Sequence, residues 1–111
     1  MRNDSFRASF QSLVEILLDG PGETAPSLRH AAADRSHAAE LPAAVAAFAD
    51  KVARAAHTVT DDDVAELLAK GYSEDAVFEI TLSAALGAGA SRLERGLQAM
   101  KTPSTPGHGG A

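Results

Sequence analysis

Residues 73–100 read SEDAVFEITLSAALGAGASRLERGLQAM, and this stretch decides the fold of the chain. Ser73 is suited to cap a helix that begins at Glu74, because its hydroxyl can accept a hydrogen bond from a free N–H group of the first turn. Large apolar residues then recur at helical spacing. They are Val77, Ile80, Leu82, Leu86, Leu93, Leu97 and Met100. The stretch therefore predicts one long C-terminal helix that runs to about Met100.

Two glycines, Gly87 and Gly89, lie inside this predicted helix. Each lowers the stability of a helix by about 1 kcal/mol relative to alanine. Such a cost suggests a compensating gain, and a glycine leaves room for another backbone to approach the helix surface. We therefore expect another backbone to pack closely against the long helix near these two residues.

The first predicted helix runs from about Ser5 to Asp19. Asp4 can cap its start, and Gly20-Pro21-Gly22 ends it sharply. Its apolar residues fall on one face at helical spacing: Phe6, Phe10, Leu13, Val14, Leu17 and Leu18. The pattern predicts an amphipathic helix that packs through this face.

The pattern is weaker between residues 23 and 41. Pro26 can occupy the first turn of a short helix that runs from Ser27 to about Asp34. Leu28 is the only large apolar residue of this segment. We therefore expect a helix at the surface or a partly irregular connection.

Two more helices are predicted before the long one. Pro42 opens a helix that ends near His57. Its buried stripe consists of Val45, Phe48, Ala49, Val52 and Ala56. Thr60 and Asp63 have the spacing of a capping box for a short helix, and Gly71 can end that helix in the left-handed conformation. Because no strand pattern is present, the fold is predicted to be all-α: a compact antiparallel bundle of about five helices.

The composition predicts one small domain with a thin core. The chain has 111 residues, and 24 of them are alanine against 23 leucine, isoleucine, valine and phenylalanine residues combined. Alanine buries little area, so each alanine contact contributes little free energy. We therefore expect additional burial at a subunit interface. The helical domain is predicted to span residues 1–101, and residues 102–111, rich in Pro, Gly and Ser, to form a disordered tail.

Charge and cysteine content exclude several functions. The formal net charge is −5, and basic residues are too few and too scattered to predict nucleic-acid or anionic-membrane binding. The chain has no cysteine, which excludes disulfides, thiolate nucleophiles and cysteine-ligated metals. No apolar run reaches the roughly 18 residues of a membrane span, and the N-terminal residues lack a secretory pattern. We therefore expect a cytoplasmic protein.

Residues 41–100 carry several short motifs in a fixed order. These are FADKV at 48–52, VTDDDV at 59–64, GYSED at 71–75, FEI at 78–80, AALGAG at 84–89, and Arg92-Leu93. The order is a helix, a short helix with an acidic cap, a glycine turn, and a long helix rich in small residues. In this order of elements the chain resembles the C-terminal helical half of the carboxymuconolactone decarboxylase and alkylhydroperoxidase D-like superfamily. The resemblance covers a little over half of the chain.

The resemblance implies an all-helical fold and a tendency to form dimers, trimers or hexamers. The peroxidase branch of that superfamily acts through a Cys-x-x-Cys-x-x-x-His helix upstream of this region, and this chain has no such motif. The decarboxylase branch does not use the cysteine pair, but its His and aromatic motif has no match here. The resemblance therefore implies an architecture and an oligomer, and it implies no thiol peroxidase activity.

Two residues are candidates for acid–base chemistry. Glu79 stands between Phe78 and Ile80, where partial burial would raise its pKa into the range of a general acid or base. The alternative is a carboxylate paired with an arginine or with backbone donors. His57, at the end of its helix, could donate a proton near Glu79, or it could interact with the last carbonyl groups of that helix.

A candidate metal site consists of His30, Asp34 and His37, which have the spacing i, i+4 and i+7. On a continuous helix the three side chains would share one face and offer nitrogen and oxygen ligands to zinc or a similar metal. The alternative is a solvated polar face. The three acids at 61–63 lack the alternating spacing of a calcium loop. No cofactor is predicted.

Three functions remain open from the sequence. The first is a non-redox helical subunit that assembles with itself or with a related helical partner. The second is a lyase or isomerase of the decarboxylase type that uses Glu79, with His57, in a pocket between helices. The third is an acidic helical module that binds other proteins.

Overall fold

The computed structural model describes the backbone of residues 2–101 and the side chains of residues 5–101, and the tail predicted at 102–111 lies outside this part. The described residues form helices and no strands. The α-helices are α1 (Arg2–Asp19), α2 (Pro26–Ala33), α3 (Ala43–Ala55), α4 (Asp61–Ala69) and α5 (Glu74–Lys101). Two 3₁₀ segments, η1 (Arg35–Glu40) and η2 (Ala56–Thr58), join them. The predicted all-α fold with a long C-terminal helix is confirmed.

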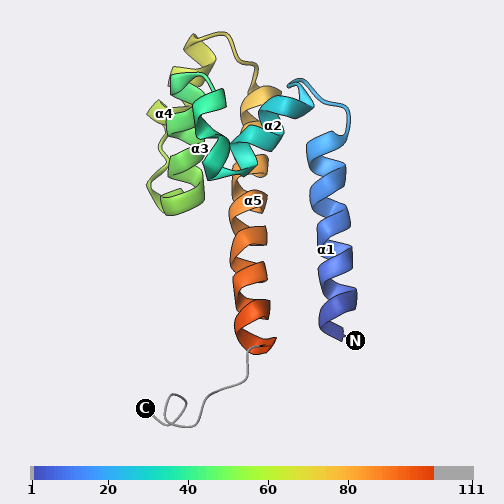
Figure 1. Ribbon diagram of the computed structural model, residues 1–111. Coiled ribbons are helices and arrows are strands. Elements are labelled where there is room, and N and C mark those ends of the chain that lie inside the picture. The colour runs from blue at the N-terminus through green and yellow to red at the C-terminus, as the bar shows by residue number, and fades with distance from the viewer. Residues whose placement is uncertain (1, 102–111) are drawn as a thin grey trace, which may run out of the picture.

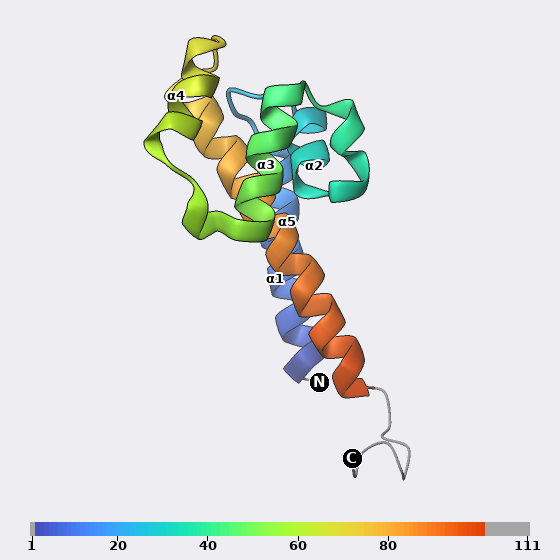
Figure 2. The ribbon, with the colours of Figure 1, turned by 90° about the vertical axis from the view of Figure 1, so that its left-hand side faces the viewer.

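Helix α5 is the axis of the molecule. Helices α2, α3 and α4 pack around its first half, and α1 lies antiparallel along it (Figure 1). Beyond the cluster, α1 and the second half of α5 continue together as a two-helix arm, which Figure 2 shows from the side. The molecule therefore measures 56 × 30 × 22 Å along its principal axes. No helix in the described part of the chain has the length and apolarity needed to cross a membrane.

The main core lies where α3 and α4 meet the first half of α5. Four residues of the predicted stripe are buried there: Val45, Phe48, Ala49 and Val52 of α3. The fifth prediction, Ala56, is wrong, because α3 ends at Ala55 and Ala56 is exposed in η2. The other buried residues of the cluster come from α2, α4, α5 and the residue before α3's proline: Ala31, Ala32, Leu41, Leu67, Val77, Ile80 and Ala84. Alanine side chains make up much of this core, so the helices approach one another closely.

Helix α2 is more central than the sequence predicted. The expected surface helix or irregular connection is a regular helix packed against α1, α3 and α5. Ala31 and Ala32 are almost completely buried, at 4% and 0% exposure. The absence of large apolar residues was misleading, because a helix with small side chains can lie deep inside a bundle when its backbone approaches the neighbouring helices closely.

The predicted helix ends are confirmed at three positions. The Thr60 hydroxyl accepts a hydrogen bond from the N–H of Asp63, and the Asp63 carboxylate accepts one from the N–H of Thr60, which completes the capping box. Gly71 follows α4 with a φ of +100°, in the left-handed region that glycine adopts without strain. Ser73 accepts a hydrogen bond from the N–H of Ala76 at the start of α5. The predicted Asp4 cap is wrong, because α1 begins at Arg2.

Gly87 is the point where α2 meets α5. A Cβ atom at Gly87 would lie 2.1 Å from the carbonyl oxygen of Ala33 and 2.7 Å from its Cα. The last residue of α2 therefore rests directly on the backbone of α5, as expected from the two helical glycines. Gly89 differs, because no atom lies within 4 Å of the Cβ position there. The contact made by Gly87 compensates for the helix propensity that it lacks.

We predict that Gly87→Ala lowers the free energy of unfolding by at least about 2 kcal/mol, because the new methyl group would collide with a backbone that cannot rotate away. Alanine is the better helix former by about 1 kcal/mol, so a loss of stability would have to come from this collision. Urea denaturation of the variant measures the change.

Gly96→Ala serves as the matched control, measured at a dilution that keeps the chain monomeric. Gly96 is exposed on the same helix, and nothing lies within 4 Å of its Cβ position. Its substitution should leave stability unchanged or raise it. Equal stability of Gly87→Ala and the wild type would contradict the close approach of α2.

Candidate functional site

The loop between α1 and α2 is held by the carboxylate of Glu79. One carboxylate oxygen accepts a hydrogen bond from the N–H of Glu23 at 2.7 Å. The other accepts from the N–H of Thr24 at 2.9 Å and from the Thr24 hydroxyl at 2.6 Å. Gly22 leaves the space for this approach, since a Cβ there would lie 2.7 Å from the carboxylate. Glu79 therefore satisfies backbone donors, which was the alternative to catalysis.

The pKa of Glu79 is lowered, which is opposite to the shift expected for a general acid. Partial burial raises the pKa of this carboxyl, but the hydrogen bonds from Thr24 and Glu23 and the nearby positive charge of Arg29 outweigh it. The carboxylate is thus held in its ionised, hydrogen-bonded form. This geometry supports a structural role for Glu79.

Arg29 holds the other side of the same loop, and sequence reasoning missed it. Its side chain is 2% exposed and donates to the carbonyl oxygens of Leu17 and Gly20, both at 2.6 Å, and of Thr24 at 3.2 Å. These are carbonyl groups at the end of α1 and in the loop, which have no helical partner. The sequence signal for this role was a charged residue next to the alanines of α2. If that helix is buried, its arginine needs polar partners, and the loop carbonyl groups provide them.

His57 lies in η2 and is exposed. In the described part of the chain no hydrogen bond or ion pair joins it to Glu79, whose partners all lie in the α1–α2 loop. The carbonyl groups at the end of α3 are bonded by other residues, namely Ala55 by the Thr58 hydroxyl and Ala53 by Arg92. The structure therefore does not bring the two candidate acid–base residues together.

His30, Asp34 and His37 do not share a helix face. Helix α2 ends at Ala33, and Asp34 is extended, with φ −126° and ψ 112°. His30 pairs with Asp19 at 2.6 Å. The continuous helix that the metal-site hypothesis required is therefore absent, and among the described residues no cluster of three or more His, Cys, Asp or Glu has the arrangement of a metal site.

Local partners account for the charges of this polar segment. The pKa of His37 is raised, chiefly by its 2.6 Å contact with Glu40. The pKa of Asp34 is lowered, chiefly because its carboxylate accepts hydrogen bonds from the hydroxyl and the N–H of Ser36. Both shifts are those of exposed ion pairs and caps, as expected for a solvated polar face.

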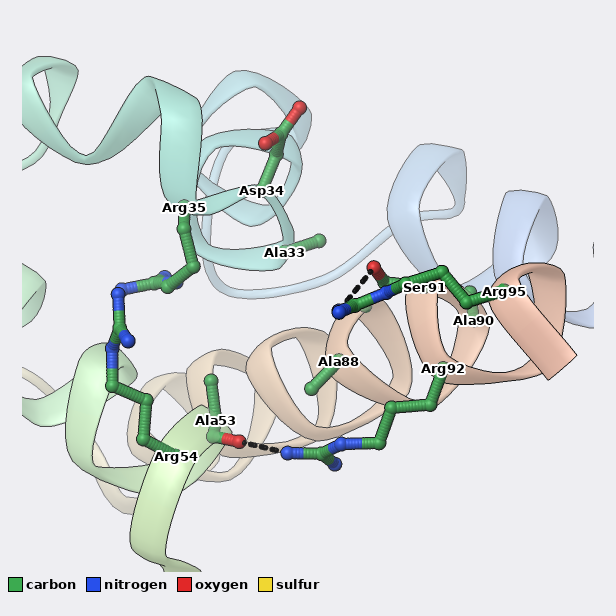
Figure 3. A pocket seen from close by; sticks show the side chains of 11 residues that line it. Ala33, Asp34, Arg35, Ala53, Arg54, Ala88, Ala90, Ser91, Arg92 and Arg95 are labelled. Atoms are coloured by element: carbon green, nitrogen blue, oxygen red, sulfur yellow. Dashed lines mark hydrogen bonds between the residues drawn. The ribbon is translucent and has the colours of Figure 1, made fainter. Parts of the chain in front are cut away.

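A cavity lies elsewhere, where the ends of α2 and α3 face the second half of α5 (Figure 3). It has a volume of about 610 Å³. Four of its lining residues are arginines: Arg35, Arg54, Arg92 and Arg95. Sequence analysis did not find this cluster, because the four residues come from three separate segments.

Comparison with known proteins adds no relative. The chain matches no protein-family model, no curated protein and no solved structure. The geometry of the molecule must therefore carry the functional argument.

We predict that Glu79→Gln lowers the free energy of unfolding by about 1–2 kcal/mol at pH 7, because the amide replaces a charged acceptor of three hydrogen bonds. A carboxyl whose pKa is depressed in the folded state stabilises the protein above its unfolded value, near 4.5. That stabilisation is lost as the pH falls through the folded pKa. The difference between variant and wild type should therefore shrink steadily below pH 4.5.

Thermal or urea denaturation as a function of pH measures this difference. Glu66→Gln is the control, since Glu66 is an exposed glutamate of α4. It should change stability little at any pH. A Glu79→Gln variant as stable as the wild type at neutral pH would show that the loop does not depend on this carboxylate.

Proposed function

We propose that the protein is a self-associating helical subunit, and that two copies pair through the outer face of α5. The observation that carries this proposal is an uncharged stripe along that face, with residues spaced three or four apart. The residues of this α5 stripe are Phe78, Leu82, Ala85, Gly89, Leu93, Gly96 and Met100. Phe78 and Met100, at its two ends, are 62% and 71% exposed. An apolar stripe of this length on a helix surface is typical of a protein interface.

The glycines of the α5 stripe support the same conclusion. Gly87 is compensated by its contact with α2, but Gly89 and Gly96 have no atom within 4 Å of their Cβ positions. Each still lowers helix stability by about 1 kcal/mol relative to alanine. Close approach of a helix from a second copy would provide the compensation that the single chain lacks.

Helix α1 also presents more apolar surface than α5 covers. At 100° per residue its apolar positions, from Ile16 round to Leu18, span an arc of about 200°. Val14 and Leu18 are buried, whereas Phe6, Leu13 and Ile16 are 60–69% exposed. The predicted single buried face of α1 is thus only half covered. A two-helix arm cannot enclose such stripes, but two arms together make a four-helix bundle, which can.

A second copy fits this surface better than a different partner does. In a symmetric dimer each patch meets its own equivalent, so a charged patch would repel itself. The α5 stripe has no charged residue, and serines accompany the exposed apolar residues of α1: Ser5, Ser9 and Ser12. Such a patch is self-complementary. The acidic residues that a general protein-binding module would use lie outside it.

Membership of the carboxymuconolactone decarboxylase-like superfamily and a cytoplasmic location stay predictions. The capping box at Thr60, the left-handed Gly71 and the close contact at Gly87 explain the quoted motifs as features that shape helices. The decarboxylase-type alternative is less favoured, because Glu79 is engaged by the loop. Self-association, in contrast, uses surfaces that the single chain leaves open.

We predict that the wild-type chain forms a dimer whose population rises with concentration, and that Gly89→Glu makes it monomeric. Glutamate fits the single chain, because the position is open and glutamate is a better helix former than glycine. In a symmetric interface it would bring two like charges together and should weaken the dimer by more than about a hundredfold. Sedimentation velocity over a range of concentrations measures this.

Ala99→Glu is the matched control. Ala99 is exposed on the same helix, about a quarter turn away from the α5 stripe. This variant should dimerise like the wild type, and both variants should keep the helical circular dichroism of the wild type. A wild-type chain that remains monomeric at millimolar concentration would overturn the proposed function.

A further inference from the structure

The cavity beside Gly87 has the size and the walls of a small-molecule site. Its volume of about 610 Å³ lies within the range of roughly 300–1,000 Å³ that ligand pockets occupy. It is lined by the end of α2, the start of η1, the end of α3 and the second half of α5. Figure 3 shows Arg35 and Arg54 meeting on one side, with Arg92 and Arg95 reaching in from α5.

The charge of this cavity is opposite to that of the whole chain. The protein carries a net charge of −5, yet four of its arginines line one cavity. Asp34 is the only acidic residue in the lining. Asp50 is not part of the lining, but its carboxylate contacts Arg54 at 2.5 Å and Arg35 at 3.7 Å. Four guanidinium groups against two carboxylates leave an excess of two positive charges.

Neither carboxylate neutralises the arginines of α5. The Asp34 carboxylate caps η1 through Ser36. Arg92 donates to the carbonyl oxygen of Ala53 at 2.7 Å, and Arg95 to the Ser91 hydroxyl at 3.3 Å. A guanidinium has five N–H groups in a planar fork, so each of these arginines keeps donors for a further acceptor. No ion pair in the described part of the chain engages either one.

Apart from Ser91, the rest of the lining is apolar. Ala33, Ala53, Ala88 and Ala90 form much of the wall, and Gly87 lies among them without a side chain. A ligand that fits must therefore present an oxyanion to the arginines and a less polar body to the alanines. Arginine forks match the paired oxygens of phosphate and carboxylate groups, and each such charge-assisted contact is stronger than a neutral hydrogen bond.

We infer that this cavity binds a small dianionic molecule, such as a phosphate monoester or a dicarboxylate, through Arg92 and Arg95. Two negative charges balance the excess of positive charge in the cavity. The inference is independent of self-association, because the cavity lining and the α5 stripe share no residue.

Isothermal titration calorimetry of the full-length chain tests the inference with three probes. Phenyl phosphate and succinate are the two dianions, and phenol is the neutral counterpart of the first. We expect saturable 1:1 binding of at least one dianion and none of phenol, and the tighter dianion identifies which oxyanion the cavity prefers. Absence of saturable binding by both dianions, or equal binding of phenol, would overturn the inference.

Variants of the cavity residues show whether the dianion binds in this cavity. Arg95→Gln removes a charge that, among the described residues, bonds the Ser91 hydroxyl and forms no ion pair, so the fold should remain intact. It should weaken binding about tenfold, and Arg95→Lys should recover only part of the loss, because lysine restores the charge without the planar fork. Lys70→Gln makes the same change of charge at the residue after α4, outside the cavity, and should leave affinity within about twofold of the wild type. Equal weakening by Arg95→Gln and Lys70→Gln would show nonspecific attraction.

A steric variant tests the cavity without changing its charge. Ala88→Leu should fill part of the space and abolish binding, whereas Ala99→Leu, the same change outside the lining, should not. Circular dichroism checks that both variants fold. If both bind phenyl phosphate or succinate as the wild type does, the ligand lies elsewhere and the assignment of this cavity is wrong.

Discussion

The contact between Ala33 and Gly87 is the constraint on which the rest of the arrangement depends. Helix axes usually pack 8–10 Å apart because side chains separate them. Here the end of α2 meets a residue of α5 that has no side chain, so the backbones themselves touch. This contact fixes where η1 begins, and η1 carries Arg35 toward α3. The shape of the arginine-lined cavity therefore follows from one missing methyl group.

The loop between α1 and α2 shows how a short connection can be fixed by two charged side chains. Arg29 supplies donors to its carbonyl groups, and Glu79 supplies acceptors to its N–H groups. Buried or half-buried backbone groups need such partners, because water cannot reach all of them. The positive charge of Arg29 also lies close enough to Glu79 to help lower the pKa of that carboxyl. The hydrogen bonds of these two charged side chains therefore fix the positions of α1 and α2.

Local features of the sequence predicted local structure well. The Thr60–Asp63 box, Gly71 and Ser73 each act within four residues of themselves, so their roles were visible in the chain. The close packing predicted from the cost of a helical glycine is present at Gly87. The centrality of α2 was missed, since alanines give no hydrophobic signal. Arg29 and the four arginines of the cavity depend on contacts between distant segments, which no periodicity encodes.

The fold does not bring the sequence-predicted site residues together. Glu79 and His57 are both titratable, but Glu79 bonds the α1–α2 loop and His57 lies in solvent. The proposed metal ligands needed one continuous helix, and Asp34 interrupts it. The chemistry of such residues indicates a shared site only when the conformation of the backbone between them is also known.

The two-helix arm has a consequence for how the molecule opens. Helix α1 is held by the clamped loop at one end and by a few buried residues along α5, so its backbone amides can exchange with solvent through local opening. Amides near Ile80 lie in the main core and should exchange only when the whole domain unfolds. A single hydrogen-exchange experiment thus contains its own reference. Protection gained by α1 alone would signal a companion on the arm, while the core amides continue to report global stability.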